Sequence, residues 1–275
     1  MKKTLLLIIT ATCLSCSKKE SRQADISLPS SGSAVSNVPQ PTQAADFSKT
    51  ETALAQMFRK ISDTDAQISE NTPDLSRQFS DSLVSFVRNN EKTLQYPFEL
   101  LQKEHVYVTT SDDGQFRVYS WDNGLGGTMR FFDQLFQFST NGKTYAKESY
   151  ASEDSQAFFS KIYTVLNKEN QPVYLAISNS ILSSKYVVQH ITAYQFKDGS
   201  LNKTKVFKTK KELLSTIAVE FDFSSVADRP ERPVEVISLN HNLLKIALVD
   251  KSSDVTKQNL LYEWDGSVFN YKGIN

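Results

Sequence analysis

Residues 135–147, LFQFSTNGKTYAK, decide the fold class of this chain. Apolar and polar side chains alternate on both sides of Asn141-Gly142, as they do in strands that bury one face. Asn-Gly commonly joins two antiparallel strands, because both residues tolerate the positive φ angles that a tight turn requires. The stretch therefore predicts a β-hairpin formed by residues 135–139 and 143–147.

The same signal recurs along the chain from residue 104 onward. Alternating segments flank four more turn sequences: Asp112-Asp113-Gly114, Asp198-Gly199, Asn240-His241-Asn242 and Asp265-Gly266. Roughly thirteen strands result, most of them joined to the next by a tight turn. We expect residues 104–275 to form a mainly β domain, an antiparallel hairpin meander arranged as a propeller-like array, a curled sheet or a sandwich.

Residues 47–103 predict a short helical segment ahead of the β domain. Apolar side chains there follow the i, i+3, i+4, i+7 spacing of one helix face: Leu54, Met57, Phe58 and Ile61. Thr72 precedes Pro73, which is typical of an N-cap followed by proline in the first helical position. We interpret the apolar residues of this segment as core.

The first sixteen residues have the layout of a secretory signal. The basic start Met1-Lys2-Lys3 precedes a mostly apolar run from Leu5 to Leu14, and the chain becomes polar after Cys16. This run is too short to span a bilayer, which takes roughly 20 apolar residues. We expect residues 1–15 to be removed as a signal peptide.

The junction Cys13-Leu14-Ser15-Cys16 resembles the lipobox of bacterial lipoproteins. The resemblance implies that the signal is cut before Cys16 and that Cys16 carries acyl chains such as palmitate, which anchor the chain to the lipid bilayer. Cys13 departs from the family pattern, which prefers leucine at that position. Ser17, in place of aspartate, implies an outer membrane lipoprotein that faces the periplasm or the cell surface. Cleavage leaves one cysteine, which excludes an internal disulfide.

Residues 16–46 are expected to be the lipidated cysteine and a disordered tether. Ser, Gln, Ala and Pro dominate the segment, and the first aromatic residue of the chain is Phe47. Such a composition cannot bury enough apolar surface to offset the loss of conformational entropy on folding. Thirty flexible residues span about 30 Å, enough to lift a domain off the lipid headgroups.

One stretch, residues 111–130, gathers side chains that suit ligand binding. The candidate ligand-binding residues are Asp112, Asp113, Trp121, Asp122, Asn123 and Arg130. Three of the nine glycines lie within residues 124–127, where they permit close approach of a ligand to the backbone. Trp121 and Arg130 are suited to stack on or clamp a planar or anionic ligand. The alternative is a wide connection between hairpins, with Trp121 buried.

The sequence contains no recognisable catalytic or metal-binding motif. Its three histidines, His105, His190 and His241, are scattered, and no Cys or His pair has the spacing of zinc ligands. A nucleophile elbow and a phosphate-binding loop are both missing. We therefore expect no metal and no cofactor. The 31 basic and 31 acidic side chains balance, which argues against a nucleic-acid partner.

The pattern Ser-x-Asp-Gly-x-Phe-Arg-x-Tyr-Ser-Trp-Asp at 111–122, followed by Gly-Gly-Thr-Met at 126–129, resembles uncharacterised lipoproteins of the Bacteroides group. The resemblance covers about residues 105–225 and implies no activity. Two functions remain open. The first, which we favour for lack of a catalytic signature, is a membrane-anchored binding or scaffold module for an envelope protein or glycan. The second is an envelope hydrolase, directed at glycan or peptide, whose acidic residues meet only in the fold, such as Asp112 and Asp122 held roughly 5–9.5 Å apart.

Overall fold

The computed structural model describes residues 41–62, 72–149 and 157–275. The expected signal peptide, Cys16 and the tether up to residue 40 lie outside these ranges. The first described element, α1 (Pro41–Ser62), begins inside the range 16–46 that we expected to be tether. Gln and Ala residues follow Pro41, and proline suits the first helical position while alanine is the strongest helix former.

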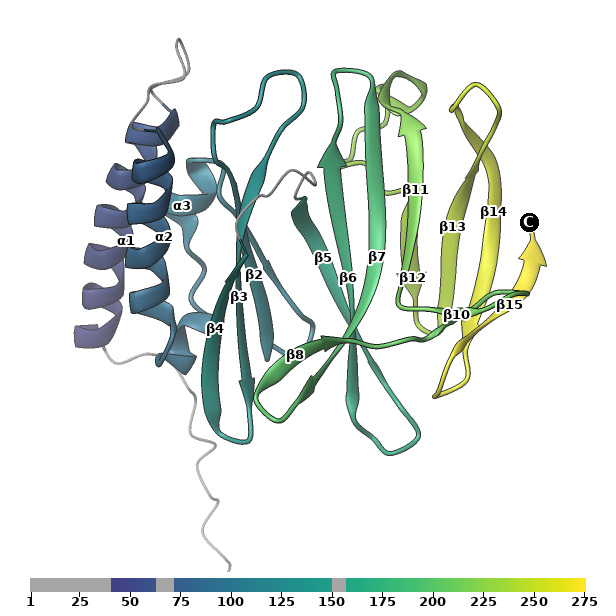
Figure 1. The fold of residues 1–275 in the computed structure, drawn as a ribbon. Coiled ribbons are helices and arrows are strands. Elements are labelled where there is room, and N and C mark those ends of the chain that lie inside the picture. The colour runs from purple at the N-terminus through teal and green to yellow at the C-terminus, as the bar shows by residue number, and fades with distance from the viewer. Residues whose placement is uncertain (1–40, 63–71, 150–156) are drawn as a thin grey trace, which may run out of the picture. The chain divides into compact units, whose positions relative to one another are not determined.

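Three further helical segments follow α1. They are α2 (Thr72–Val87), the 3₁₀-helix η1 (Glu91–Leu94) and α3 (Glu99–Lys103). Helix α2 begins at the Thr72-Pro73 step, as the sequence predicts. Leu54, Phe58 and Ile61 of α1 are buried, which confirms the predicted apolar face of that helix. In Figure 1 α1 and α2 lie side by side at one end of the described structure.

Four antiparallel strands form the first sheet. They are β1 (Tyr107–Thr110), β2 (Phe116–Asp122), β3 (Phe132–Thr140) and β4 (Lys143–Ser149), paired in the order β1-β2-β3-β4. Strands β3 and β4 are the hairpin predicted from residues 135–147, with Thr140 opposite Lys143. Asn141 and Gly142 between them have φ angles of 53° and 69°, as the turn requires.

The second sheet contains the longest strands. Its members are β5 (Phe158–Leu166), β6 (Pro172–Ile181), β7 (Tyr186–Lys197), β8 (Ser200–Lys203) and β11 (Thr216–Asp222). The order is β11-β7-β6-β5, and β8 pairs with β7. All pairs are antiparallel, and the predicted turn at Asp198-Gly199 joins β7 to β8.

The third sheet forms the C-terminal end of the fold. It comprises β9 (Phe207–Lys208), β10 (Leu213–Leu214), β12 (Ile237–Asn240), β13 (Leu243–Val249), β14 (Val255–Trp264) and β15 (Phe269–Ile274). The order is β10-β9-β15-β14-β13-β12, and the 3₁₀-helix η2 (Phe223–Val226) follows β11. Strand β15 pairs with β9 in parallel, whereas the other pairs of this sheet are antiparallel.

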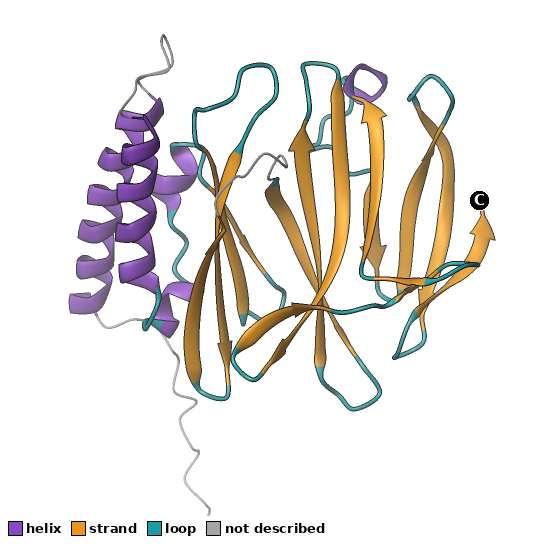
Figure 2. Ribbon diagram, viewed as in Figure 1, coloured by secondary structure: helices purple, strands orange, loops and turns teal. Residues whose placement is uncertain are grey.

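Three apolar cores lie between these layers. Helices and first sheet share a core that includes Phe79 and Trp121, whereas Phe116 and Tyr174 belong to the core between the first and second sheets. A third core joins the second and third sheets. Figures 1 and 2 show the same sequence of layers, from helices through three sheets. The expected mainly β, antiparallel fold with a helical N-terminal segment is confirmed.

Polar side chains of the first sheet attach it to strand β5. Thr109 Oγ1 donates to the Phe159 carbonyl at 2.7 Å, and the Phe159 amide donates to Ser120 Oγ at 3.2 Å. Gln134 Nε2 donates to the Ala157 carbonyl at 2.6 Å. The first two sheets are therefore joined by buried hydrogen bonds along β5 and at Ala157, the residue just before it.

Candidate functional site

Trp121, one of the residues that we expected to contact a ligand, is a core residue. Its side chain is fully buried, and its Nε1 donates a hydrogen bond to Ser76 Oγ of α2 at 3.1 Å. Its ring meets that of Phe79, also on α2, edge-to-face at 5.1 Å. Trp121 therefore holds α2 against the first sheet, and the expectation that it stacks on a ligand is wrong.

Asn123 is buried as well and shapes the start of the β2–β3 loop. Its Nδ2 donates to Asp133 Oδ1, and its Oδ1 accepts from the Leu125 amide, both at 3.1 Å. Only 2% of Asn123 is exposed. Buried polar groups are normally hydrogen-bonded within the fold, and Asn123 follows that rule rather than facing a ligand.

The carboxylates of Asp112 and Asp113 shape the β1–β2 turn and attach it to the second sheet. Asp113 accepts hydrogen bonds from Ser111 Oγ at 2.6 Å and from the Tyr174 hydroxyl at 2.9 Å. Asp112 Oδ2 accepts from the Thr164 amide at 3.1 Å. Both side chains are thus used within the fold.

Asp112 and Asp122 do not form the acid and base pair of a hydrolase. The Ser111 amide bonds to the Phe116 carbonyl at 2.7 Å, so Asp112 lies at the Phe116 end of β2, and Asp122 is the last residue of that strand. Six steps of about 3.3 Å separate the two ends of β2 by about 20 Å. That separation exceeds the distance that acid–base pairs of glycosidases need.

Asp122 and Arg130 pair with each other across the neck of the β2–β3 loop. Arg130 Nη1 lies 3.2 Å from Asp122 Oδ2, and Asp122 Oδ1 accepts from the Gly124 amide at 3.0 Å. The Arg130 amide donates to the Ile181 carbonyl at the end of β6, at 3.1 Å. The loop is thereby fixed to the second sheet, and Trp121, which is fully buried, does not line an open cleft together with Asp122 and Arg130.

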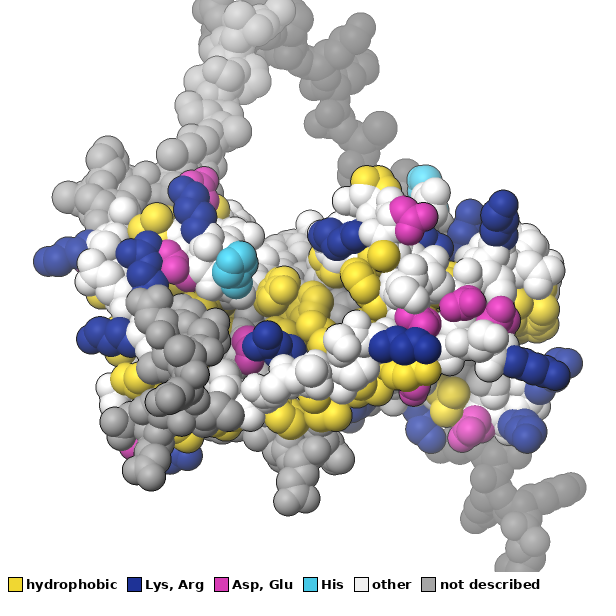
Figure 3. Space-filling model, turned by 90° about the horizontal axis from the view of Figure 1, so that it is seen from above, with side chains coloured by type: hydrophobic (Ala, Val, Ile, Leu, Met, Phe, Trp, Pro, Cys, Tyr) yellow, Lys and Arg dark blue, Asp and Glu magenta, His cyan; other side chains and the backbone are white. Residues whose placement is uncertain are grey.

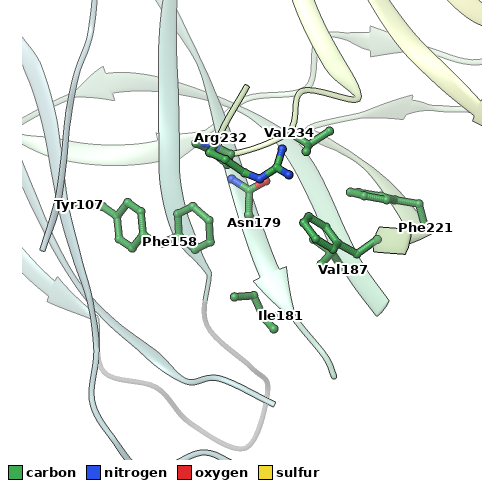
Figure 4. A pocket seen from close by; sticks show the side chains of 10 residues that line it. Tyr107, Phe158, Asn179, Ile181, Val187, Phe221, Arg232 and Val234 are labelled. Carbon is green, nitrogen blue, oxygen red and sulfur yellow. The ribbon is translucent and has the colours of Figure 1, made fainter. Parts of the chain in front are cut away.

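A different hollow lies beside this loop, and Arg130 borders it. A first cavity of about 280 Å³ and a second of about 470 Å³ share three lining side chains, those of Ile181, Val187 and Phe223. We call the two together the apolar groove. Its other apolar side chains are Tyr107, Phe158, Phe221, Pro233 and Val234. Figure 4 shows these side chains converging from β1, β5, β6, β7 and β11, and from the loop before β12.

The glycine-rich loop forms one wall of the groove. Gly127, Thr128 and Arg130 line its second cavity, together with Ser184 of the β6–β7 turn. Figure 3 shows apolar side chains gathered in a hollow on this face, with basic side chains beside it. The loop that the sequence singled out therefore borders the groove, but the residues of this loop that line it come after Trp121-Asp122-Asn123 in the chain.

Two polar side chains that line the groove, those of Arg232 and Asn179, are already hydrogen-bonded within the fold. Arg232 donates from its guanidinium to the backbone carbonyls of Ala227, Arg229 and Glu231, and it lies 5.6 Å from the centre of the Phe223 ring. Asn179 donates to Ser160 Oγ and accepts from Gln189 Nε2 at 2.8 Å. The lining of the groove is mainly apolar, and these two polar side chains are engaged within the fold.

Exposed aromatic and aliphatic side chains occur at the groove and in the β2–β3 loop that borders it. The rings of Tyr107 and Phe158 stack at 4.2 Å, and Tyr107 remains 36% exposed. Burial, and then the Asp122 carboxylate, raise the pKa of Tyr107, so its phenol stays neutral at physiological pH. Leu125 and Met129 of the β2–β3 loop are also exposed. Aromatic and Met side chains of this kind are enriched at protein interfaces.

No protein family model, no curated protein and no solved structure matches this chain. Within residues 41–62, 72–149 and 157–275, no group of three or more acidic, His or Cys side chains is placed to hold a metal ion. None of the described helices has the length and apolar character needed to cross a membrane. Function is therefore argued from the apolar groove and its surroundings.

Sequence reasoning missed most of the groove. Ile181 and Val187 flank the β6–β7 turn, and Phe221 and Phe223 lie where β11 passes into η2. The available signal was a cluster of apolar residues at strand ends, where polar turn residues are usual. That signal becomes meaningful only when the second sheet brings these ends together.

Proposed function

We propose that this chain is a membrane-anchored envelope lipoprotein that acts as a binding module, and that the apolar groove receives an apolar segment of a partner protein. The observation that carries the proposal is the open, apolar lining of the groove beside the β2–β3 loop. Covering such a surface is favourable by about 25 cal/mol per Å² of apolar area removed from water.

The chemistry of the groove favours a protein segment over a glycan. A sugar needs several unpaired donors and acceptors, whereas Asn179, Arg232 and the Asp122–Arg130 pair are engaged within the fold. Tyr107, which lines the groove, and Leu125 and Met129 of the β2–β3 loop are exposed and supply adaptable apolar contact instead. Such pockets suit the anchor side chains that dominate protein–protein binding energy.

The proposed anchor places this module at the envelope. Acylated Cys16 would hold the chain on the lipid bilayer, in an outer membrane lipoprotein that faces the periplasm or the cell surface. Multiple acyl chains bind a membrane stably, whereas one chain binds marginally. A tether of residues 17–40 would let the groove reach partners near the membrane.

Site-specific photocrosslinking in cells tests the proposal. A photoreactive amino acid replaces Ser184 or Thr128, two exposed residues that line the groove. Lys143, exposed at the start of β4 and opposite the far end of β3, is the control position. We expect a protein adduct of defined mass from Ser184 and Thr128 and none from Lys143.

Two results would count against this function. Adducts of the same mass and yield from all three positions would indicate non-specific proximity. An adduct that contains lipid but no protein, or no adduct from either groove position, would reject a protein partner.

A further inference from the structure

A separate cavity, of about 530 Å³, lies between the first and second sheets and shares no lining residue with the apolar groove. Its character is different, because hydroxyl and basic side chains line it. They are Lys147 of β4, Ser178 and Ser180 of β6, His190 and Thr192 of β7, and Lys203 of β8. We call it the polar cavity.

Side chains on one face of β6 change from apolar to polar along the strand, and the polar ones line this cavity. Tyr174 and Ala176 on one face of β6 are buried in the core between the first two sheets. The next residues on that face are Ser178 and Ser180, which are 7% and 3% exposed. Two serine hydroxyls therefore occupy positions where the pattern of this face would place core side chains. Neither hydroxyl has a hydrogen-bond partner among the residues that the structure describes. Unpaired hydroxyls that face a cavity are available to a ligand.

The described side chains that line the polar cavity carry positive charge. Lys147 and Lys203 line it from opposite sheets, and none of the Asp and Glu residues that the structure describes does so. Neither lysine forms an ion pair with any described residue. His190 lies opposite Ser178 in the β6–β7 pairing and adds a ring that can donate or accept a hydrogen bond.

An apolar floor completes the cavity. Phe136, Phe159 and Tyr194 line it beneath the polar groups and belong to the core between the two sheets. Aromatic faces pack well against the C–H groups of a sugar ring or a similar planar surface. The volume falls within the range of about 300–1,000 Å³ that is usual for small-molecule sites.

We propose that the polar cavity binds a small anion that also carries hydroxyl groups, such as a carboxylated or phosphorylated sugar. Lys147 and Lys203 pair with the anionic group, since both are cationic and unpaired. Ser178 and Ser180 exchange hydrogen bonds with the ligand hydroxyls, and the aromatic floor supports the ring. This site is independent of the apolar groove, so failure of one proposal leaves the other standing.

Isothermal titration calorimetry on the full chain in detergent, at neutral pH and low salt, tests the proposal. The probes are glucuronic acid and glucose 6-phosphate, with glucose and inorganic phosphate as controls. We expect at least one sugar anion to bind, and glucose and phosphate to bind at least about tenfold more weakly, because each lacks half of the complementary contacts.

Matched lysine variants identify the site. Lys147→Met and Lys203→Met remove one charge each, and Lys143→Met and Lys205→Met remove equally exposed lysines that do not line the cavity. Each cavity variant should weaken the sugar anion about tenfold or more, the usual cost of losing a charged hydrogen bond, and the controls should change it less than about twofold.

The proposal is overturned by any of three results. The first is that neither sugar anion binds. The second is that glucose or phosphate binds as tightly as the sugar anion. The third is that the control variants weaken binding as much as Lys147→Met and Lys203→Met do. Because all four lysines are exposed, their variants should keep the urea midpoint of the unsubstituted chain, and this is checked in parallel.

Discussion

Trp121 shows how a residue with the chemistry of a binding site can belong to the core. Its indole is fully buried and donates one hydrogen bond, to Ser76 of α2. Trp121→Phe removes that bond and some volume, so we expect the free energy of unfolding to fall by about 1–3 kcal/mol. Urea unfolding measures the change. Trp264→Phe, at a half-buried indole bonded to the Leu166 carbonyl, is the control and should cost less.

An unchanged urea midpoint for Trp121→Phe would show that the indole is not part of the core. Its ligand-binding role would then have to be reconsidered.

His190 lines the polar cavity, and its surroundings there shift its pKa. Burial, and then the positive charge of Lys203, lower its pKa below the usual value of about 6.5. The unfolded chain therefore binds a proton more readily than the folded chain just below that pH, and stability falls as the pH decreases through about 6.5. Lys147 and Lys203 are the other charged groups among the described residues that line the cavity with it. On the neighbouring strand β11, Glu220 lies two residues from Ala218, which is opposite His190.

His190→Gln should reduce this loss of stability. The free energy of unfolding is measured by urea at pH 7.5 and pH 5.5 for both proteins, and the decrease between the two values should be smaller in the variant. An equal decrease in both proteins would show that His190 is not the group responsible.

At the scale of elements, one carboxylate joins α1 to α3. Glu51 of α1 is 3% exposed, and its Oε1 accepts from the amides of Leu100 at 2.6 Å and Leu101 at 3.2 Å. Its Oε2 accepts from the Tyr96 hydroxyl at 2.8 Å, and burial together with this carboxylate raises the Tyr96 pKa. The helical segment is therefore held in place by buried polar contacts as well as by its apolar face.

Glu51→Gln weakens these contacts, since a neutral amide oxygen accepts hydrogen bonds less strongly and the amide nitrogen cannot accept. We expect a loss of about 1–3 kcal/mol in the free energy of unfolding, measured by urea, and almost none for Asp46→Asn on the exposed side of the same helix. Similar losses in both variants would mean that the effect comes from helix charge alone.

Local elements of the fold were predictable from the sequence, and non-local ones were not. The Asn141-Gly142 turn and the start of α2 at Thr72 depend on neighbouring residues and are confirmed. Strand β9 has only two residues and pairs in parallel with β15, some sixty residues later, so no local pattern indicates it. Strand β6 is buried on both faces and therefore shows weak alternation.

The candidate site likewise has a part that the sequence could indicate and a part that it could not. Residues 111–130 were recognised by composition, yet most of their polar side chains form hydrogen bonds within the fold. Arg130 alone of the predicted ligand residues lines the groove. The groove and the polar cavity each combine side chains from several strands, and their formation depends on how two sheets are joined along β5.

At the scale of the whole molecule, the proposed anchor makes a separate prediction. Cys16→Ser removes the thiol that would carry the acyl chains, so the chain should move from the membrane fraction to the soluble fraction. Intact-mass analysis should show the loss of the lipid mass, and Cys13→Ser serves as the control because that residue would be removed with the signal peptide. A membrane-bound Cys16→Ser chain would reject the lipoprotein assignment.

The most direct test of the binding function combines the groove probe with a variant that fills the groove. Gly127 lines the groove and has open space where a side chain would extend, so Gly127→Leu should fold normally and occupy the site. We predict that photocrosslinking from Ser184 yields a protein adduct in the unsubstituted chain, and that Gly127→Leu abolishes it without shifting the urea midpoint. An adduct of undiminished yield in Gly127→Leu would contradict binding in the apolar groove.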